Sequence, residues 1–207
     1  MIVSIILSHP DKGSFNHAIA DTAFAALREN GHEVRFHDLY AERFDPLLPA
    51  AEIPKNAGLP PLIKRHCDEI TQAGGIVIVH PNWWGQPPAV MKGWIDRVIR
   101  PGVAYEFKEG DSGGGVPCGL LKAKTAVVFN TSNTASKRER TVFGDPLDMI
   151  WKNCVFGLCG ITDVRRRTFS VIVTSTEMKR ERWLKEVRKI IISAFGKPVQ
   201  RTGPAPT

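Results

Sequence analysis

Apolar residues follow two alternating patterns along the chain, one typical of strands and the other of helices. Five short runs predict strands over residues 2–8, 33–39, 75–80, 124–129 and 164–173. Segments with apolar residues at helical spacing follow them and end near residues 30, 72, 98, 158 and 195. The first and third runs are apolar on both faces, which is typical of central strands in a parallel sheet covered by helices on each side. The pattern therefore predicts an α/β fold in which five parallel strands are joined by right-handed crossovers.

Two segments interrupt this alternation and show little periodicity. Residues 41–61 hold five prolines and residues 99–121 are rich in glycine, so both are predicted to be surface excursions. A length of 207 residues suits one domain. We therefore predict a single domain over residues 1–200 that carries these two excursions. The composition of residues 201–207 cannot support a core and predicts a disordered tail.

The chain is basic, with a formal net charge of +7 and a pI of about 9.4. Its basic residues are dispersed and are not interleaved with aromatic ones, so the charge favours phosphate-bearing ligands over nucleic acid. Four cysteines without a paired spacing predict free thiols in a reducing compartment. There is no basic signal region and no run long enough to span a membrane, so we expect a cytoplasmic protein without an integral membrane segment. The histidines share no metal-ligand spacing and predict no metal site.

Ligands of open α/β sheets bind outside the carboxyl ends of the strands. Three predicted loops lie there, namely His9–Asn16, Pro81–Gln86 and Asn130–Thr134. The first loop leads into a helix, whose free N–H groups favour an anion, although a plain N-cap explains Ser14 equally well. Trp83 and Trp84 project in different directions, so a planar ligand beside one of them explains the pair better than joint core packing. The third loop has five consecutive polar side chains, which a solvated loop explains as well as a ligand site does.

The same loops and the helix after the second one carry a family resemblance. The segments that carry it are His9-Pro10, Ser14-Phe15-Asn16, Pro81-Asn82-Trp83-Trp84, Lys92-Gly93-Trp94-Ile95-Asp96-Arg97-Val98 and Pro101-Gly102-Val103-Ala104-Tyr105. Together they resemble the NAD(P)H:quinone oxidoreductase family over about residues 1–160. The resemblance implies a flavodoxin-like fold, which is a five-stranded parallel sheet in the order 2-1-3-4-5 with helices on both faces.

The resemblance also implies a flavin site and a homodimer. The flavin phosphate or pyrophosphate would be held by His9, Ser14, Phe15 and Asn16. The isoalloxazine would lie along Pro81, Asn82, Trp83, Trp84 and Gly85, and its pyrimidine edge along Asn130, Thr131, Ser132 and Asn133. Members of the family are homodimers with the flavin at the interface, so Tyr105 and Phe107 would cap the substrate pocket of the opposite subunit.

The implied activity is two-electron transfer through a flavin, which is FAD or FMN. NADH or NADPH passes a hydride to flavin N5 and leaves, and a small-molecule acceptor such as a quinone, nitro or azo compound then takes its place, which is a ping-pong mechanism. No essential catalytic side chain is predicted. Mammalian members carry a Tyr and a His after the fourth-strand loop that assist charge transfer, whereas residues 135–145 contain neither and Phe143 stands about where the His would be.

Two alternatives of other classes remain. Some relatives are ancillary proteins of ion transporters, so one alternative is a non-catalytic regulatory flavoprotein subunit. The other is a simple electron carrier. True flavodoxins are usually acidic, whereas this chain is basic, so the carrier fits the sequence less well.

Overall fold

The five predicted parallel strands form one sheet in the computed structural model, which describes residues 1–108, 110 and 115–196. Its order is β2-β1-β3-β6-β7, and all four strand pairs are parallel. The strands are β1 (Ile2–Leu7), β2 (Glu33–Asp38), β3 (Gly75–Pro81), β6 (Thr125–Ser132) and β7 (Asp163–Ser170). This arrangement confirms the flavodoxin-like order 2-1-3-4-5. The tail predicted over residues 201–207 lies outside the described residues.

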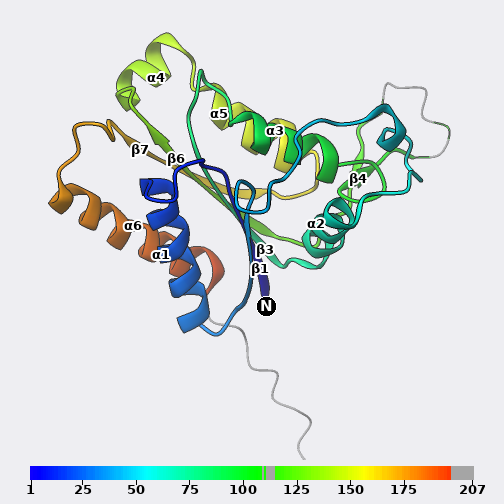
Figure 1. Ribbon diagram of the computed structural model, residues 1–207, viewed down its shortest axis with the longest axis horizontal. Helices are drawn as coiled ribbons and strands as arrows, with labels where there is room; N and C mark the ends of the chain where they lie inside the picture. The colour runs from blue at the N-terminus through cyan, green and yellow to red at the C-terminus, as the bar shows by residue number, and fades with distance from the viewer. Residues whose placement is uncertain (109, 111–114, 197–207) are drawn as a thin grey trace, which may run out of the picture.

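Helices cover both faces of the sheet and bury a separate apolar core on each (Figure 1). On one face lie α1 (Phe15–Glu29) and α6 (Glu177–Phe195), and on the other lie α2 (Pro61–Gln72), α3 (Ala89–Val98), α5 (Pro146–Met149) and the π-helix η2 (Ile150–Gly157). Side chains alternate along each strand, so Ile5 and Leu7 pack under α1 while Ile6 packs into the opposite core. Within the described residues, no helix combines the length and apolar character needed to cross a bilayer.

The structure differs from the predicted elements after β6. The helix predicted to end near residue 158 begins at Pro146 and changes into a π-helix after Met149. The short helix α4 (Ser136–Val142) was not predicted, because its polar sequence lacks apolar periodicity. The last strand stops at Ser170, since Val171 adopts a left-handed backbone conformation with φ of 62°.

Both predicted excursions contain short regular elements. Residues 99–121 hold an antiparallel pair of two-residue strands, β4 (Tyr105–Glu106) and β5 (Cys118–Gly119). The other excursion, residues 41–61, contains a single turn of 3₁₀ helix, η1 (Ala50–Glu52). Neither segment joins the main sheet, as the sequence predicts.

The motif at residues 92–98 anchors the 41–61 excursion to α3. A Cβ atom on Gly93 would lie 2.3 Å from the Cα of Pro46, so only glycine lets the two segments approach. Arg97 donates to both carboxylate oxygens of Glu52, at 2.9 and 2.5 Å, and to the carbonyl of Asp45 at 2.6 Å. The side chains of Arg97 and Glu52 are each 4% exposed. The most distinctive part of the motif therefore serves packing in this chain.

We predict that Arg97→Ala destabilises the protein by about 3–5 kcal/mol, because it leaves the Glu52 carboxylate buried and unpaired. Lys92→Ala, on the same helix, breaks only the exposed pair with Asp96 and should cost less than about 1 kcal/mol. Urea unfolding of the two variants measures both free energies. Equal losses of unfolding free energy in the two variants would contradict the anchoring role of Arg97.

Candidate functional site

A cavity of about 790 Å³ opens at the carboxyl edge of the sheet, where all three predicted loops meet. Its lining includes these predicted residues: His9, Ser14, Phe15, Asn16, Pro81, Asn82, Trp83, Trp84, Gly85, Thr131, Ser132 and Asn133. The loops follow β1, β3 and β6, which are neighbours in the sheet. From β1 the chain passes to β2 at one edge of the sheet. It then returns to β3 on the other side of β1 and continues to β6 and β7, so the cavity lies where the winding direction reverses.

The first loop and the third are joined by hydrogen bonds at the start of α1. The Asn16 side chain donates to the Thr131 hydroxyl at 3.0 Å, and that hydroxyl lies 3.2 Å from the Asn16 carbonyl oxygen. Ser14 is the N-cap of α1, since its hydroxyl accepts a hydrogen bond from the backbone N–H of His17. Ser14 also lines the cavity, so the capping role and the ligand-binding role are compatible. The first turn of α1 thus presents backbone N–H groups beside the cavity, which favours an anionic ligand group.

The second loop is a tight turn that exposes an indole. Trp83 and Gln86 exchange two backbone hydrogen bonds, at 3.1 and 3.0 Å, and the two residues between them have positive φ. Positive φ at both central positions defines a type I′ turn, which normally contains Asn, Asp or Gly. Here the first position is Trp84, with φ of 57° and a side chain that is fully exposed in the single chain. A bulky residue held in a strained conformation beside a cavity indicates a functional requirement for that side chain.

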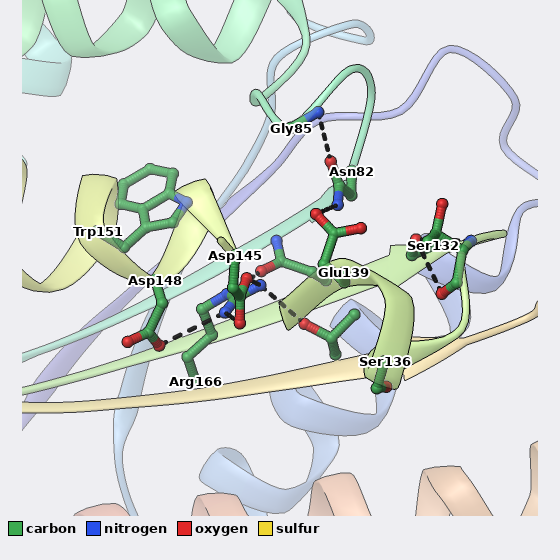
Figure 2. A network of polar contacts seen from close by, with 12 residues as sticks. Asn82, Gly85, Ser132, Ser136, Glu139, Asp145, Asp148, Trp151 and Arg166 are labelled. Carbon is green, nitrogen blue, oxygen red and sulfur yellow. Dashed lines mark hydrogen bonds and ion pairs between the residues drawn. The ribbon is translucent and has the colours of Figure 1, made fainter. Parts of the chain in front are cut away.

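Gly85 lets this turn pack against the other wall of the cavity. Its φ is 72°, and a Cβ atom there would lie 2.8 Å from Cγ of Pro146. The N–H of Gly85 donates to the side-chain carbonyl of Asn82 at 3.0 Å (Figure 2). The backbone N–H of Asn82 in turn donates to the carbonyl of Thr131 at 2.7 Å. The second loop is therefore held to the third loop and to the start of α5.

Asn130, the first residue of the predicted third loop, lies behind the cavity wall. It is fully buried, and its side-chain N–H donates to Nε2 of His80 at 3.0 Å. Its side-chain carbonyl accepts from Arg166 at 2.8 Å. The next three residues line the cavity, whereas Asn130 does not, and the ligand contact implied for Asn130 stays a prediction.

His80 links Asn130 to the helices on the far side of the sheet. Its Nδ1 lies 2.7 Å from the carbonyl oxygen of Pro81 and so carries the proton, while Nε2 accepts from the Trp151 indole at 2.9 Å. Complete burial lowers the pKa of His80 to about 4. Arg166, 5% exposed, pairs with Asp145 at 2.8 Å and with Asp148 at 3.4 Å (Figure 2). This network fixes the loop at residues 143–146 against β6 and β7.

Six further residues line the cavity without having been predicted to do so: Glu139, Phe143, Pro146, Ile172, Val173 and Arg180. They come from α4, the turn after it, the start of α5, the loop after β7 and the first turn of α6. The strained Val171 begins the loop after β7, where its N–H donates to the carbonyl of Ser132 at 2.8 Å. A β-branched residue rarely adopts positive φ, so no local pattern in the sequence could have revealed this bend.

Tyr105 and Phe107 are not among the residues that line this cavity. They lie on the strand β4 and just beyond it, and their rings meet edge to face with centroids 5.9 Å apart. Phe107 is 49% exposed in the single chain. Their predicted role in the pocket of an opposite subunit stays a prediction.

His37, Glu42 and His66 come together in space although their sequence spacing showed no metal pattern. The Trp94 indole donates to Nδ1 of His66 at 3.1 Å, so the proton of His66 sits on Nε2 and points to Glu42 at 2.8 Å. His37 lies between two carboxylates, those of Glu42 at 3.0 Å and Glu69 at 2.7 Å. The nitrogens that would bind a metal are therefore used as donors within the protein.

Burial would raise the pKa of Glu42, but hydrogen bonds from His37 and His66 outweigh it and lower the pKa to about 2. The group is therefore a charged, hydrogen-bonded cluster that joins β2 to α2. We assign it a structural role and keep the prediction of no metal site.

A doubly wound parallel sheet with a ligand cavity at its reversal point defines a flavodoxin-like protein. The family model described as "Flavodoxin-like fold" matches residues 1–191. An uncharacterized NAD(P)H oxidoreductase of Haemophilus influenzae is 38% identical over 173 residues, which cover 81% of this chain and 83% of the relative. Human ribosyldihydronicotinamide dehydrogenase [quinone] is 26% identical, covering 96% of this chain and 90% of its own.

Among solved structures, the NAD(P)H:quinone oxidoreductase from Methanothermobacter marburgensis superimposes with a TM-score of 0.77 at 25% identity. The match covers 92% of this chain and 95% of that one. The chain therefore belongs to the flavodoxin-like NAD(P)H:quinone oxidoreductase family, and it is an oxidoreductase.

The lowered pKa of His80 predicts a loss of stability as pH falls from about 6.5 to about 4. Within that window the unfolded chain binds a proton that the native protein excludes, so up to about 3 kcal/mol is lost. Above the window both states are neutral, and the full stability is present. His80→Gln keeps an acceptor for Trp151 but does not titrate, so its unfolding free energy should change less with pH. Urea unfolding at several pH values measures this, and equal pH dependence in both proteins would contradict it.

Proposed function

We propose that the protein is a flavin-dependent NAD(P)H oxidoreductase that transfers two electrons to a quinone or a similar nitro or azo acceptor by a ping-pong mechanism. The observation that carries the proposal is the convergence of three loops of different chemistry on one cavity. The loop after β3 contributes exposed indoles, the loop after β1 leads into a helix N-terminus, and the loop after β6 contributes a row of polar side chains. Family membership supports the same activity.

The residues of the cavity fit the chemistry of a flavin, which joins a flat ring system to a phosphate tail. Trp83 and Trp84 are 41% and 101% exposed, so both residues have indole surface available to pack against a ring. The first turn of α1 offers N–H groups to a phosphate. Thr131, Ser132 and Asn133 offer hydrogen bonds to polar ring atoms. Aromatic, anion-binding and polar groups thus occur in one continuous site.

A bound flavin would supply the chemistry of accepting and donating hydride. The chain itself would orient the reactants, because hydride transfer requires close and aligned contact between them. The β1 and β3 loops form one wall, and the loop after β7 with Phe143 forms another. Both the nicotinamide and the acceptor would use the same opening in turn, and that order is the ping-pong mechanism.

We also propose that two copies of the chain form the working unit. Trp84 is fully exposed, and Phe143, which lines the same cavity, is 51% exposed. Burying such residues against a second copy would remove apolar surface from water. In this arrangement Tyr105 and Phe107 of one copy would close the cavity of the other.

The purified protein is expected to bind FAD or FMN and to oxidise NADH or NADPH when menadione is added. Absorbance of the bound flavin and consumption of the nicotinamide measure the two properties. Identification of the released flavin by chromatography then distinguishes FAD from FMN, and sedimentation gives the number of subunits. Protein that stays colourless after reconstitution with either flavin would refute the proposal.

Two variants of Trp84 separate its binding role from its structural cost. Trp84→Ala and Trp84→Gly should both weaken flavin binding by about threefold to tenfold, since each removes one ring contact. Trp84→Gly should also raise the unfolding free energy of the flavin-free protein by about 1 kcal/mol, because glycine adopts positive φ without strain. Fluorescence titration and urea unfolding test the two effects. Unchanged flavin affinity in both variants would remove Trp84 from the site.

A further inference from the structure

Glu139 is a buried carboxylate that lines two cavities at once. It lies on α4, is 6% exposed and forms part of the wall of the main cavity. It also lines a second cavity of about 210 Å³. Figure 2 shows its carboxylate directed toward Asn82, with the cluster around Arg166 nearby. Among the described residues, Glu139 is the one titratable residue that lines both the main cavity and the smaller one, which we call the side cavity.

The side cavity is polar and large enough for several water molecules. Hydroxyl groups of Ser132, Ser136 and Ser170 line it. Its charged groups are Arg140 from α4, Asp145 and Asp148 at the start of α5, and Arg166 and Arg167 from β7. A water molecule occupies roughly 30 Å³ and needs two to four polar partners, and this cavity meets both conditions.

The carboxylate of Glu139 is held in one orientation toward the main cavity. Asn82 donates to Oε1 of Glu139 at 3.0 Å. The other end of the Asn82 amide is occupied by the N–H of Gly85, so the amide cannot turn away. Among the described residues, Asn82 is the only one whose side chain is hydrogen-bonded to the Glu139 carboxylate, so its second oxygen remains available.

The proposed reaction requires a proton as well as a hydride. An acceptor such as a quinone becomes a hydroquinone by taking one hydride and one proton. Residues 135–145 contain neither Tyr nor His to supply that proton. A carboxyl group is one of the side chains able to transfer protons in catalysis.

Two other titratable side chains on the main cavity are less suited to this role. Arg180 stays protonated and cannot release a proton. His9 belongs to the first loop, beside the start of α1, and its Nδ1 accepts a hydrogen bond from the backbone N–H of Asp11 at 3.1 Å.

We propose that Glu139 is the proton donor to the acceptor and that water in the side cavity restores its proton. The O–H bond of the Glu139 carboxyl breaks as the oxygen of a quinone or nitro acceptor, or the nitrogen of an azo acceptor, gains the proton. The hydride and its two electrons come from NAD(P)H by way of the flavin. The carboxylate then takes a proton from solvent through the side cavity. This inference rests on the proposed function and adds a catalytic residue to it.

Glu139→Gln tests the proposal because it keeps the size and the hydrogen-bonding capacity of the side chain but cannot donate an acidic proton. The reduced protein is mixed in a stopped-flow instrument with menadione, which needs a proton, or with ferricyanide, which accepts electrons without one. We expect menadione reduction to slow by on the order of 100-fold. Ferricyanide reduction should stay within about twofold of the original rate.

Controls distinguish proton transfer from a general disturbance. Glu181→Gln makes the same chemical change at an exposed position on α6, next to Arg180, and should leave both rates unchanged. Glu139→Asp keeps a carboxyl group and should restore part of the menadione rate. Fluorescence titration of the flavin-free Glu139→Gln protein should give the flavin affinity of the original chain, a result that does not depend on activity.

The outcomes separate this inference from the function on which it rests. If Glu139→Gln slows both acceptors equally or weakens flavin binding, Glu139 shapes the site and is not the proton donor. Unchanged rates with both acceptors would show that the proton comes from elsewhere. If the original chain binds no flavin or reduces neither acceptor with NAD(P)H, the proposed function itself fails.

Discussion

Parallel pairing of β1, β3 and β6 is the constraint on which the rest of this structure depends. Because these strands run in one direction, the three segments that leave them emerge at the same edge of the sheet. Segments more than 100 residues apart in sequence thereby come close enough for Asn16 to bond Thr131. The buried side chains of His80, Asn130 and Arg166 then fix this edge from beneath. Hydrogen bonds among buried side chains therefore support the edge of the sheet on which the cavity lies.

Much of this arrangement could be predicted from the sequence, and the reasons are physical. The two-sided apolar runs at β1 and β3 reveal central strands, and the position of a ligand site follows from strand direction alone. Twelve of the thirteen residues predicted to bind the flavin line the cavity, and Asn130 lies behind it. The wall formed by α4 and the loop after β7 escaped prediction. Glu139 lies in a polar segment without periodicity, and the bend at Val171 has no local signature.

The sequence signature of the family proves to be largely architectural in this chain. Gly93, Trp94 and Arg97 contact Pro46, His66 and Glu52, all of which belong to the 41–61 excursion or to α2. The residues of the signature thus serve in this chain to pack the excursion against α3. Chemical differences between relatives must be sought in other segments, which here include α4 and the turn that follows it.

The attachment of α4 has a consequence for how such enzymes diversify. This helix has seven residues and no side-chain cap, and it lies outside both apolar cores. Its described side-chain ties to the rest of the fold include the contacts of Ser136 with Ser170 and of Glu139 with Asn82. Substitutions in it therefore carry little folding penalty. Exchange of the proposed acid–base group in this one short segment would then change the range of compounds that are reduced, while the sheet and the three loops stay constant.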